Sequence, residues 1–408
     1  MTACPRHLRV AYVGHTAQPS GAELALARLL PALRNITPLV ILGANGPLVP
    51  VLQGLGAEVE ILPLAERTQS LARHDVVPGV GMVRSIIDVV GYSRRLARCL
   101  RRFEADLVVT TSLKACLYGG LAGRFARLPV LWHVHDRISE DYLPRGATAL
   151  VRRCARLLPS GIVTNSESTL DSLRLPPRAA ARLVAGVVGN ASPLCKPGST
   201  PVEVEAPEGG LVVGMLGRLT PWKGQDIFLR AFAEAFPDGP ERAVVIGGAL
   251  FGERDFLQTL QNLAEKLSIR DRVRFLGHVD DAVRELRGLD ILVHASRIPE
   301  PFGQVVVEGL ALGLPVIAAD AGGPAEIVVD GENGLLAPPG DVHALAERLL
   351  RLSADDDLRK RLSAAGPASV ARFAPDAVAA RMEQIYMAVA GRRRRPGNAL
   401  RDRLCGST

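Results

Sequence analysis

The sequence lacks any cysteine pattern that would hold a metal or a disulfide framework. Its six cysteines are scattered over 408 residues, and no two of them form a CxxC pair. Zinc sites and small disulfide-rich domains both need a regular cysteine spacing, so the sequence argues against these two classes. We expect reduced cysteines and a cytoplasmic protein.

Long apolar runs and several catalytic signatures are also missing. No uninterrupted apolar stretch reaches the roughly 20 residues of a membrane span, and the start, MTACPRHLRVAYVGH, does not follow the charged-then-apolar pattern of a signal peptide. The absence of P-loop, GxSxG and HExxH motifs argues against an NTPase, an α/β-hydrolase and a zinc protease. The apolar content of 48%, with few aromatics and abundant Gly and Pro, is typical of an α/β protein.

The net charge of +7 is unevenly distributed. Residues 1–205 carry 24 Lys and Arg against 15 Asp and Glu, residues 206–390 carry 19 against 26, and residues 391–408 carry 6 against 1. A helix predicted over about 79–103 ends in five arginines: Arg94, Arg95, Arg98, Arg101 and Arg102. Such basic regions suit an anionic membrane, an acidic glycan or nucleic acid, or are simply an Arg-rich surface. No nucleic-acid motif accompanies them, so we expect no nucleic-acid partner.

Strand-like apolar runs alternate with helical patterns along the whole chain. Examples are LRVAYV, DLVVT and PVLWHVH in the first half, and LVVGMLGR, RAVVIGG and DILVHA in the second. This alternation predicts parallel sheets with helices on both faces. We therefore predict an α/β protein with two Rossmann-like, doubly wound domains. Ligands of such sheets bind outside the carboxyl ends of the strands, here in the cleft between the domains.

The domain boundaries follow from breaks in this alternation. The stretch 196–210, rich in Pro, Gly and Glu, predicts a linker. We expect an N-terminal domain over 1–200, a C-terminal domain over 201–375, a helix over 376–391 that returns to the N-terminal domain, and a disordered basic tail over 392–408.

Two carboxylates eight residues apart flank a Pro-Phe-Gly turn after the apolar run LDILVHAS. Glu300 is expected in the turn and Glu308 inside a short helix that begins near Gly303. The pair suits an elongated ligand with an anion in its middle and hydroxyls at both ends, which is the shape of a nucleotide-sugar. The spacing alone equally allows Glu300 to cap the helix and Glu308 to be solvated.

The start of that helix is itself a predicted anion site. Its first backbone N–H groups have no intrahelical partners and lie at the positive end of the helix dipole. They are expected near Phe302, Gly303 and Gln304.

A second cationic stretch, GRLTPWKG, follows the predicted strand VVGML. Thr220 and Pro221 predict a helix start, which would place Lys223 in the first turn, where a cation calls for an external anion. Arg218 and Lys223 together could hold a diphosphate.

The run WHVHDR ends a predicted buried strand in the first half. Alternation places His133 and His135 on one face, with His135 nearest the strand end and able to bond a sugar hydroxyl. A metal pair or a structural histidine remain alternatives, although no third metal ligand lies at a suitable spacing. Gly21, in a glycine-containing loop before a helix, could bring the backbone close to a phosphate.

These features occur in a fixed order: a Gly-Ala-Glu loop, a His-Asp pair, Gly-Arg…Lys-Gly, and Glu-Pro-Phe-Gly…Glu followed by Gly-Gly-x-x-Glu. This order resembles the retaining glycosyltransferases of family 4, which have the GT-B fold. The match spans Leu8 to Gly391 and is strongest from Gly217 to Asp341. One departure is Ser20, where the family often has glycine.

The resemblance implies that the second domain binds the donor and the first binds the acceptor. It assigns Arg218 and Lys223 to the donor diphosphate, Glu308 to the ribose and Glu300 to the transferred sugar. It also implies roles for His135 near the reacting face of the sugar and for Gly21, Gly217, Phe302, Gly303 and Gln304 in binding the substrate.

The expected function is therefore retaining transfer of a sugar from a UDP- or GDP-linked donor to a glycan, glycolipid or small-molecule acceptor, in bacterial polysaccharide or glycolipid synthesis. No metal or other cofactor is expected, because Arg218 and Lys223 would do the work of a divalent ion and no DxD-like motif is present. A nucleotide-sugar 2-epimerase and a non-catalytic GT-B binding protein are the alternatives. Peripheral contact with the inner face of an anionic membrane stays open.

Overall fold

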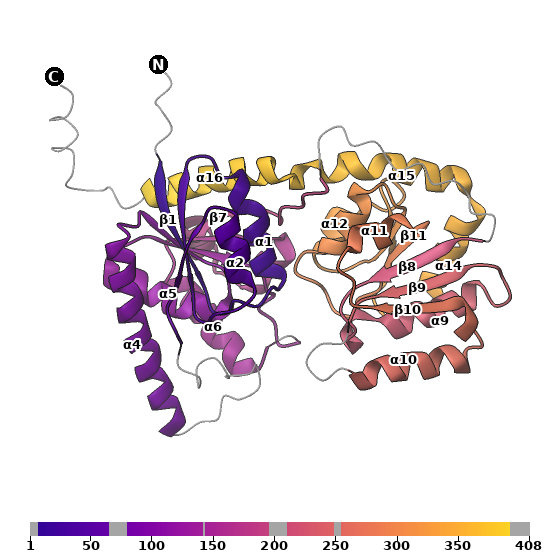
Figure 1. Ribbon diagram of the computed structural model, residues 1–408, viewed down its shortest axis with the longest axis horizontal. Helices are drawn as coiled ribbons and strands as arrows, with labels where there is room; N and C mark the ends of the chain where they lie inside the picture. The colour runs from indigo at the N-terminus through magenta and orange to yellow at the C-terminus, as the bar shows by residue number, and fades with distance from the viewer. Residues whose placement is uncertain (1–6, 65–79, 142, 196–209, 249–253, 392–408) are drawn as a thin grey trace, which may run out of the picture. The chain divides into compact units, whose positions relative to one another are not determined.

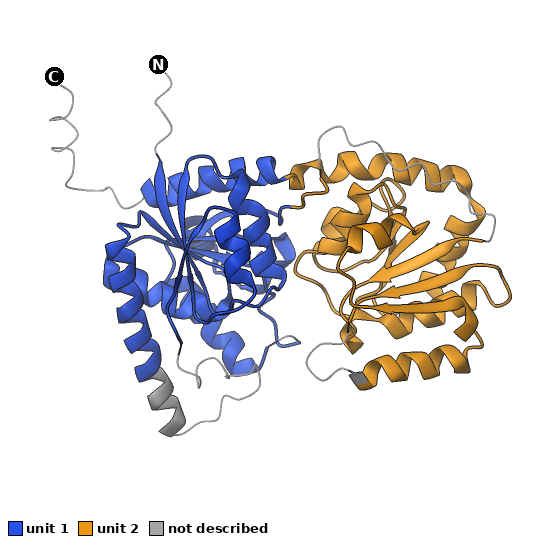
Figure 2. Ribbon diagram, in the orientation of Figure 1, with its two compact units in different colours: residues 1–191, 375–408 blue, residues 192–374 orange. Residues whose placement is uncertain are grey.

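The structure is a computed structural model that describes residues 7–64, 80–141, 143–195, 210–248 and 254–391. The chain divides into two compact units, and Figure 2 colours them separately. Unit 1 consists of residues 1–191 and 375–408, and unit 2 of residues 192–374. The predicted linker, apart from Gly210, and the predicted tail lie outside the described residues.

Unit 1 contains a parallel sheet, of which the structure describes seven strands in the order β3-β2-β1-β4-β5-β6-β7 (Figure 1). The strands are β1 (Leu8–Gly14), β2 (Ile36–Leu42), β3 (Glu58–Ile61), β4 (Leu107–Thr110), β5 (Val130–Val134), β6 (Gly161–Thr164) and β7 (Val184–Val187). The helices between them are α1 (Gly21–Leu29), α2 (Leu48–Gly54), α4 (Val80–Arg102), α5 (Leu113–Ala126), α6 (Arg145–Leu157), α7 (Glu167–Ser172) and α8 (Pro177–Leu183).

Alternation along the strands of unit 1 supplies a separate core on each face of the sheet. On β1, Val10 and Tyr12 pack with α1, α2 and the last helix, whereas Ala11 and Val13 pack with α4, α5 and α6. Successive residues of a strand point to opposite faces, so a continuous apolar run fills both cores. This is why LRVAYV carries almost no polar residue.

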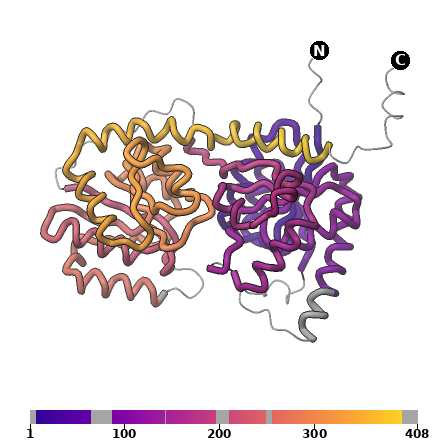
Figure 3. Tube along the Cα trace, turned by 180° about the vertical axis from the view of Figure 1, so that it is seen from behind, coloured from indigo at the N-terminus to yellow at the C-terminus, as the bar shows by residue number. Residues whose placement is uncertain are grey.

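The last helix, α16 (Pro375–Gly391), packs on unit 1 although the residues before it belong to unit 2. Its buried side chains, which include Met382 and Tyr386, join the core formed with β1 and β4. The ring of Tyr386 meets that of Tyr12 edge-on, with centroids 6.2 Å apart. Figures 1 and 3 show α16 beside α1 and β1 from opposite sides.

Unit 2 contains a second parallel sheet, whose six described strands are ordered β10-β9-β8-β11-β12-β13. They are β8 (Val212–Leu216), β9 (Arg242–Ile246), β10 (Val273–Gly277), β11 (Ile291–His294), β12 (Val316–Ala319) and β13 (Leu335–Ala337). The helices are α9 (Gln225–Ala235), α10 (Arg254–Lys266), α11 (Ala282–Arg287), α12 (Gln304–Ala311), α13 (Gly323–Ile327), α14 (Val342–Ala354) and α15 (Asp356–Val370).

Both sheets follow the strand order of a Rossmann domain. In each unit the first strand is central, the second and third lie on one side, and the fourth and later strands lie on the other. The predicted α/β class with two doubly wound sheets is therefore confirmed. The order reverses between β1 and β4 in unit 1 and between β8 and β11 in unit 2. Ligands of such sheets bind at the carboxyl ends of the two strands that flank this reversal.

We expect Met382→Ala to destabilise unit 1 by about 2–4 kcal/mol, because it leaves a cavity in a core that α16 shares with the sheet. Unit 2 should be unaffected, so calorimetry would show one transition shifted and the other in place. Gln384→Ala, at an exposed site on the same helix, is the control. Equal stability of the two variants would contradict this packing.

Candidate active site

The candidate site of unit 2 lies on the two strands that flank the reversal of strand order. Gly217, Arg218 and Lys223 follow β8, and Glu300 follows β11. Residues far apart in the sequence thus meet at the carboxyl edge of one sheet. This is the place where an open α/β sheet binds its ligand.

The loop after β8 differs from its predicted form. The sequence predicted one helix starting at Thr220 and Pro221, but residues Pro221–Lys223 form a separate 3-10 turn and α9 begins only at Gln225. Gly224 between them is left-handed, with φ of 79°, and a Cβ there would lie 2.0 Å from the carbonyl oxygen of Ala295. The close approach of the β11 loop therefore requires glycine, and glycine breaks the helix.

This break leaves Lys223 outside the first turn of α9 and beside the β11 loop. Its Nζ lies 2.6 Å from Oε1 of Glu300 and 4.7 Å from the centre of the Trp222 ring. The N–H of Arg297 donates to the carbonyl of Trp222 at 2.8 Å, so backbone contacts also join the two loops. Thr220 is the N-cap and Lys223 lies in a helical turn as predicted, but this turn is a separate 3-10 helix and not the start of α9. A carboxylate from the other predicted stretch, that of Glu300, faces the lysine.

Gly217 and Arg218 lie on the same loop as this lysine, between β8 and the 3-10 turn. The Lys223 stem passes 3.8 Å from the point where a Cβ on Gly217 would be, which is an ordinary van der Waals contact. The Gln225 side chain donates to the carbonyl of Arg218 at 2.9 Å and fixes the backbone there. The structure thus brings Gly217, Arg218, Lys223 and Glu300 together.

The carboxylate of Glu300 receives three hydrogen bonds on one oxygen. Oε1 accepts from Lys223 Nζ at 2.6 Å, from His294 Nε2 at 2.7 Å and from the hydroxyl of Ser296. Burial alone would raise the pKa of Glu300, which is only 8% exposed. The charge of Lys223 and the bonds from His294 and Lys223 outweigh burial and hold this pKa well below its usual range. Glu300 is therefore ionised at neutral pH.

His294 and Ser296 were not predicted as site residues. His294 is the last residue of an apolar strand and Ser296 a small residue after it, and both patterns are also those of a structural core. A polar residue at the carboxyl end of a strand next to the reversal indicates a site residue. This pattern could have identified both residues.

The backbone of Glu300 is pinned to the start of α13. Its carbonyl accepts from the N–H of Gly323 at 2.8 Å, and a Cβ on Gly322 would lie 2.3 Å from that same carbonyl oxygen. Gly322 has φ of 65°. Both facts require a glycine at 322, so the Gly-Gly pair supports the Glu300 loop rather than contributing a side chain.

The predicted anion site at the start of α12 has the expected local form. Gly303 is the N-cap with φ of 94°, Phe302 is buried against the edge of Phe373, and Gln304 donates to Glu308 Oε1 at 3.1 Å within the helix. The alternative that Glu300 caps this helix is wrong, because Gly303 does.

The predicted residues of unit 1 lie at the corresponding edge of its own sheet. His135 follows β5, and its ring contacts that of His133, with centroids 3.9 Å apart and planes tilted by 40°. Burial lowers the pKa of His135 to about 4, so the imidazole is neutral at pH 7. Asn165, after β6, donates to the carbonyl of His135 at 3.3 Å.

The first loop of unit 1 adds residues at the reversal between β1 and β4. His15 follows β1 and its Nδ1 lies 2.9 Å from the Ser112 hydroxyl, which follows β4. Burial lowers the pKa of His15 to about 4. Gly21 begins α1, and the first turn of this helix holds Glu23, which is buried and accepts from the hydroxyl of Ser20. His15 was not predicted, although its place at a strand end is the same signal as for His294.

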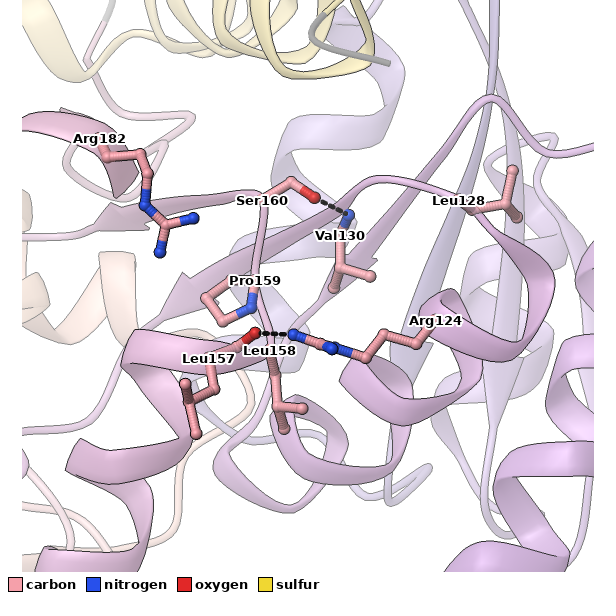
Figure 4. A pocket seen from close by; sticks show the side chains of 8 residues that line it. All are labelled: Arg124, Leu128, Val130, Leu157, Leu158, Pro159, Ser160 and Arg182. Carbon is pink, nitrogen blue, oxygen red and sulfur yellow. Dashed lines mark hydrogen bonds between the residues drawn. The ribbon is translucent and has the colours of Figure 1, made fainter. Parts of the chain in front are cut away.

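A pocket of about 450 Å³ in unit 1 is lined by none of these residues. Figure 4 shows the side chains that do line it. Its lining residues lie at the opposite edge of the sheet, where the strands begin: Val130 starts β5 and Ser160 precedes β6. Arg124 and Arg182 enter it, and they donate to carbonyls of Leu157 and Arg156 at the end of α6. Its arginines thus hold a helix end.

Within the ranges given above, no group of three or more His, Cys, Asp or Glu residues is placed to bind a metal ion. The same ranges contain no helix that is long and apolar enough to span a membrane.

Two family models match the chain. The model described as glycosyl transferases group 1 matches residues 200–369, and that described as Glycosyltransferase Family 4 matches residues 48–182. The chain belongs to family 4 of the glycosyltransferases. Each of the two models matches mainly one unit, so the family resemblance covers both sheets.

Relatives and solved structures agree with this family. An exopolysaccharide phosphotransferase of Streptomyces coelicolor is 31% identical over 304 residues, which are 74% of this chain and 30% of that protein. A D-inositol 3-phosphate glycosyltransferase of Corynebacterium glutamicum is 36% identical over 179 residues, 43% of each protein. The chain thus spans less than half the length of either.

The crystal structure of Anabaena HepE with UDP is 27% identical, with a TM-score of 0.78 over 93% of this chain and 100% of that one. A second HepE structure, with UDP-glucose, has a TM-score of 0.74. This similarity covers both units of this family 4 protein and confirms the GT-B fold.

We expect Glu300→Gln to lower the stability of unit 2 by about 1–3 kcal/mol at neutral pH, because it leaves the largely buried ammonium of Lys223 without its carboxylate. The folded-state pKa of Glu300 lies below its unfolded value of 4.5. The stabilisation is therefore fully present above that value and is lost as the pH falls through the folded-state pKa.

Thermal unfolding at a series of pH values tests this prediction. The gap between wild type and Glu300→Gln should be constant from neutral pH to about pH 5 and should narrow below it. Glu265→Gln, at an exposed site of unit 2, is the matched control. A gap that widens towards acid pH would contradict the ionised, paired state of Glu300.

Proposed function

We propose that this chain transfers a sugar from a nucleotide-sugar to a hydroxyl of a glycan, glycolipid or small-molecule acceptor, in bacterial polysaccharide or glycolipid synthesis. The observation that carries the proposal is the Lys223–Glu300 pair, on the loops that follow the two strands flanking the reversal in unit 2. Arg218 lies on the same loop as Lys223. A cation for a diphosphate and an ionised carboxylate for sugar hydroxyls meet there. A purely structural role would not require charged groups at this edge.

The donor is proposed to bind unit 2 and to be a UDP-sugar. HepE, which is similar to this chain in both units, has been crystallised with UDP and with UDP-glucose. In unit 2, Arg218, Lys223 and the first N–H groups of α12 would bind the diphosphate, Glu300 the sugar and Glu308 the ribose. The backbone at Gly217, next to the Lys223 stem, would contribute to the same site.

The acceptor is proposed to bind unit 1 through the carboxyl edge of its sheet. His135 is neutral there, so it can donate one hydrogen bond and accept another, as a sugar hydroxyl requires. Gly21 leaves space at the start of α1, since nothing lies within 4 Å of the point where its Cβ would be. A ligand could approach the backbone closely at this point.

The proposed reaction needs charge stabilisation rather than a protein nucleophile. As the bond between the sugar C1 and the phosphate oxygen breaks, negative charge develops on the leaving diphosphate. Lys223, Arg218 and the start of α12 are fixed donors for that charge, which is often the largest catalytic contribution. The acceptor hydroxyl attacks from the side that the diphosphate leaves, so the anomeric configuration is retained. The two cations would replace a divalent metal ion.

Kinetics of single variants test this function. A panel of nucleotide-sugars is first screened by thermal shift, and hydrolysis of the stabilising donor is then measured. We expect Lys223→Ala and Arg218→Ala each to lower kcat/KM by about 10²-fold or more. Lys360→Ala, which removes an exposed lysine of unit 2, should behave as wild type. Near-normal kcat/KM in the first two variants would refute the scheme.

The same assay tests the remaining features of the proposal. Activity should persist in excess EDTA, and NMR of the product should show the anomeric configuration of the donor. An inverted product would exclude the mechanism, and release of the 2-epimer from UDP-N-acetylglucosamine would favour a 2-epimerase instead.

We also propose peripheral contact between unit 1 and an anionic membrane through α4. Its last three turns expose Arg94, Arg98 and Arg101 on one side, and Ile87 further up the helix is 64% exposed. Exposed cations beside an exposed apolar side chain fit an anionic lipid surface.

Vesicle co-sedimentation tests this contact. Binding to vesicles rich in phosphatidylglycerol should fall with added salt and should weaken in Arg94→Gln/Arg98→Gln. Arg284→Gln/Arg287→Gln, at exposed sites in the last turn of α11, is the charge-matched control. Binding that is insensitive to salt and to α4 would contradict the contact.

A further inference from the structure

Glu300 has two hydrogen-bond donors besides the lysine that the proposed function assigns to the diphosphate. His294 and Ser296 both donate to Oε1, and both lie on or just after β11. They are buried, His294 at 6% exposure and Ser296 at zero. Neither has a part in the proposed contacts with the donor. The proposed contacts with the donor therefore do not explain why both residues bond to Glu300.

The neighbouring strand determines which ring nitrogen of His294 accepts a hydrogen bond and which one faces Glu300. The N–H of Ala319, at the end of β12, donates to His294 Nδ1 at 3.4 Å. The pairing of β11 with β12, in which His294 lies opposite Ala318, holds this N–H in place. A peptide N–H can only donate, so Nδ1 is the acceptor and the proton of the neutral ring is on Nε2. Nε2–H then points at Glu300 Oε1, 2.7 Å away.

The ion pair alone would make Lys223 a poor ligand for a donor. If Lys223 were the only partner of the buried Glu300, drawing its ammonium towards a diphosphate would leave an uncompensated carboxylate in the interior. That carboxylate would then either hold the lysine back or take up a proton. The two further donors lower this cost, because Oε1 keeps two hydrogen bonds when the lysine moves.

We propose that His294, together with Ser296, is a positioning residue that keeps Glu300 ionised and in a fixed orientation while Lys223 turns from Glu300 to the diphosphate of the donor. This inference rests on the proposed function of unit 2. His294 acts through Glu300 and does not itself contact the donor. The three bonds fall on Oε1, so Oε2 is the oxygen that faces the sugar.

The charged and titratable groups that face Glu300 come from two elements. Lys223 reaches it from the turn after β8, and His294 from β11. Burial opposes ionisation, and Lys223 and His294 favour it. Removing the histidine therefore matters most when the lysine is also drawn away, which is when a diphosphate binds.

Calorimetric titration with UDP tests the proposal without knowledge of the acceptor. Wild type, His294→Leu and His294→Gln are titrated at about pH 6 in buffers of different ionisation enthalpy, which reports the protons taken up on binding. Glutamine can donate to Glu300 and accept from Ala319, whereas leucine fills similar space without a donor.

We expect His294→Leu to take up additional protons on binding UDP, up to about one relative to wild type, because Glu300 becomes protonated as Lys223 leaves it. Its Kd for UDP should rise by about 10-fold, which corresponds to one pKa unit of coupling. His294→Gln should restore both values. A purely packing role would give equal behaviour of the leucine and glutamine variants.

Ser296→Ala provides an independent measurement in case His294→Leu does not fold. It removes the second donor with little change in volume and should shift proton uptake in the same direction by a smaller amount. Wild-type proton uptake and Kd in both His294→Leu and Ser296→Ala would overturn the proposal. If His294→Leu does not fold, wild-type values in Ser296→Ala alone would do so.

Lys223→Ala separates this inference from the function on which it rests. If wild type does not bind UDP, or Lys223→Ala binds it as tightly as wild type, the assignment of the diphosphate to Lys223 fails and the inference fails with it. If Lys223→Ala binds UDP weakly while the His294 and Ser296 variants match wild type, the inference alone fails.

Discussion

The ion pair between Lys223 and Glu300 is the constraint on which the architecture of unit 2 depends most visibly. The two side chains come from positions 77 residues apart and meet at 2.6 Å in a largely buried site. The Lys223 loop can approach the loop after β11 so closely because Gly224 has a positive φ and no Cβ to clash with Ala295, and Gly322, also with a positive φ, leaves room for the backbone of Glu300. The glycines of these two motifs therefore allow the backbone conformations that bring Lys223 and Glu300 together.

The two units use the same strand order but place different chemistry at the carboxyl edge. In unit 2, full charges face each other on the loops after β8 and β11. In unit 1, the histidines after β1 and β5 are buried, and burial lowers the pKa of each so that both are neutral at pH 7. The charged edge suits an anionic ligand, and the two neutral histidines suit hydroxyl groups. This contrast is what donor and acceptor would require of the two units.

Much of the fold could be predicted from the sequence, because each strand of a doubly wound sheet is an apolar run followed by a helical period. The last helix, predicted over 376–391, spans Pro375–Gly391 in the structure. The predicted helix does begin after Thr220, but it ends at Lys223 because Gly224 separates it from α9, and the reason is the carbonyl of Ala295, 71 residues away. Local propensity contains no such distant contact.

The same limit applies to the site. Glu300, Lys223 and Arg218 stood out in the sequence as charged residues in loops, where polar side chains are informative. His294 did not, because a histidine that ends an apolar strand is indistinguishable from a core residue until the strand order is known. The reversal of strand order between β8 and β11 is what marks the end of β11 as part of a ligand site. Topology, rather than composition, is the missing information.

Stability alone does not account for these buried charges. Replacing a buried ion pair by well-packed apolar residues is often neutral or stabilising, whereas removing one partner is costly. A chain selected only to fold would therefore gain little from Lys223, Glu300 and the hydrogen-bonding histidine behind them. Three donors bond to one oxygen of this carboxylate, and a lysine is among them. In the proposed scheme a ligand draws the lysine away, and the other two donors keep the carboxylate ionised. That exchange has a use only if an anion enters the site.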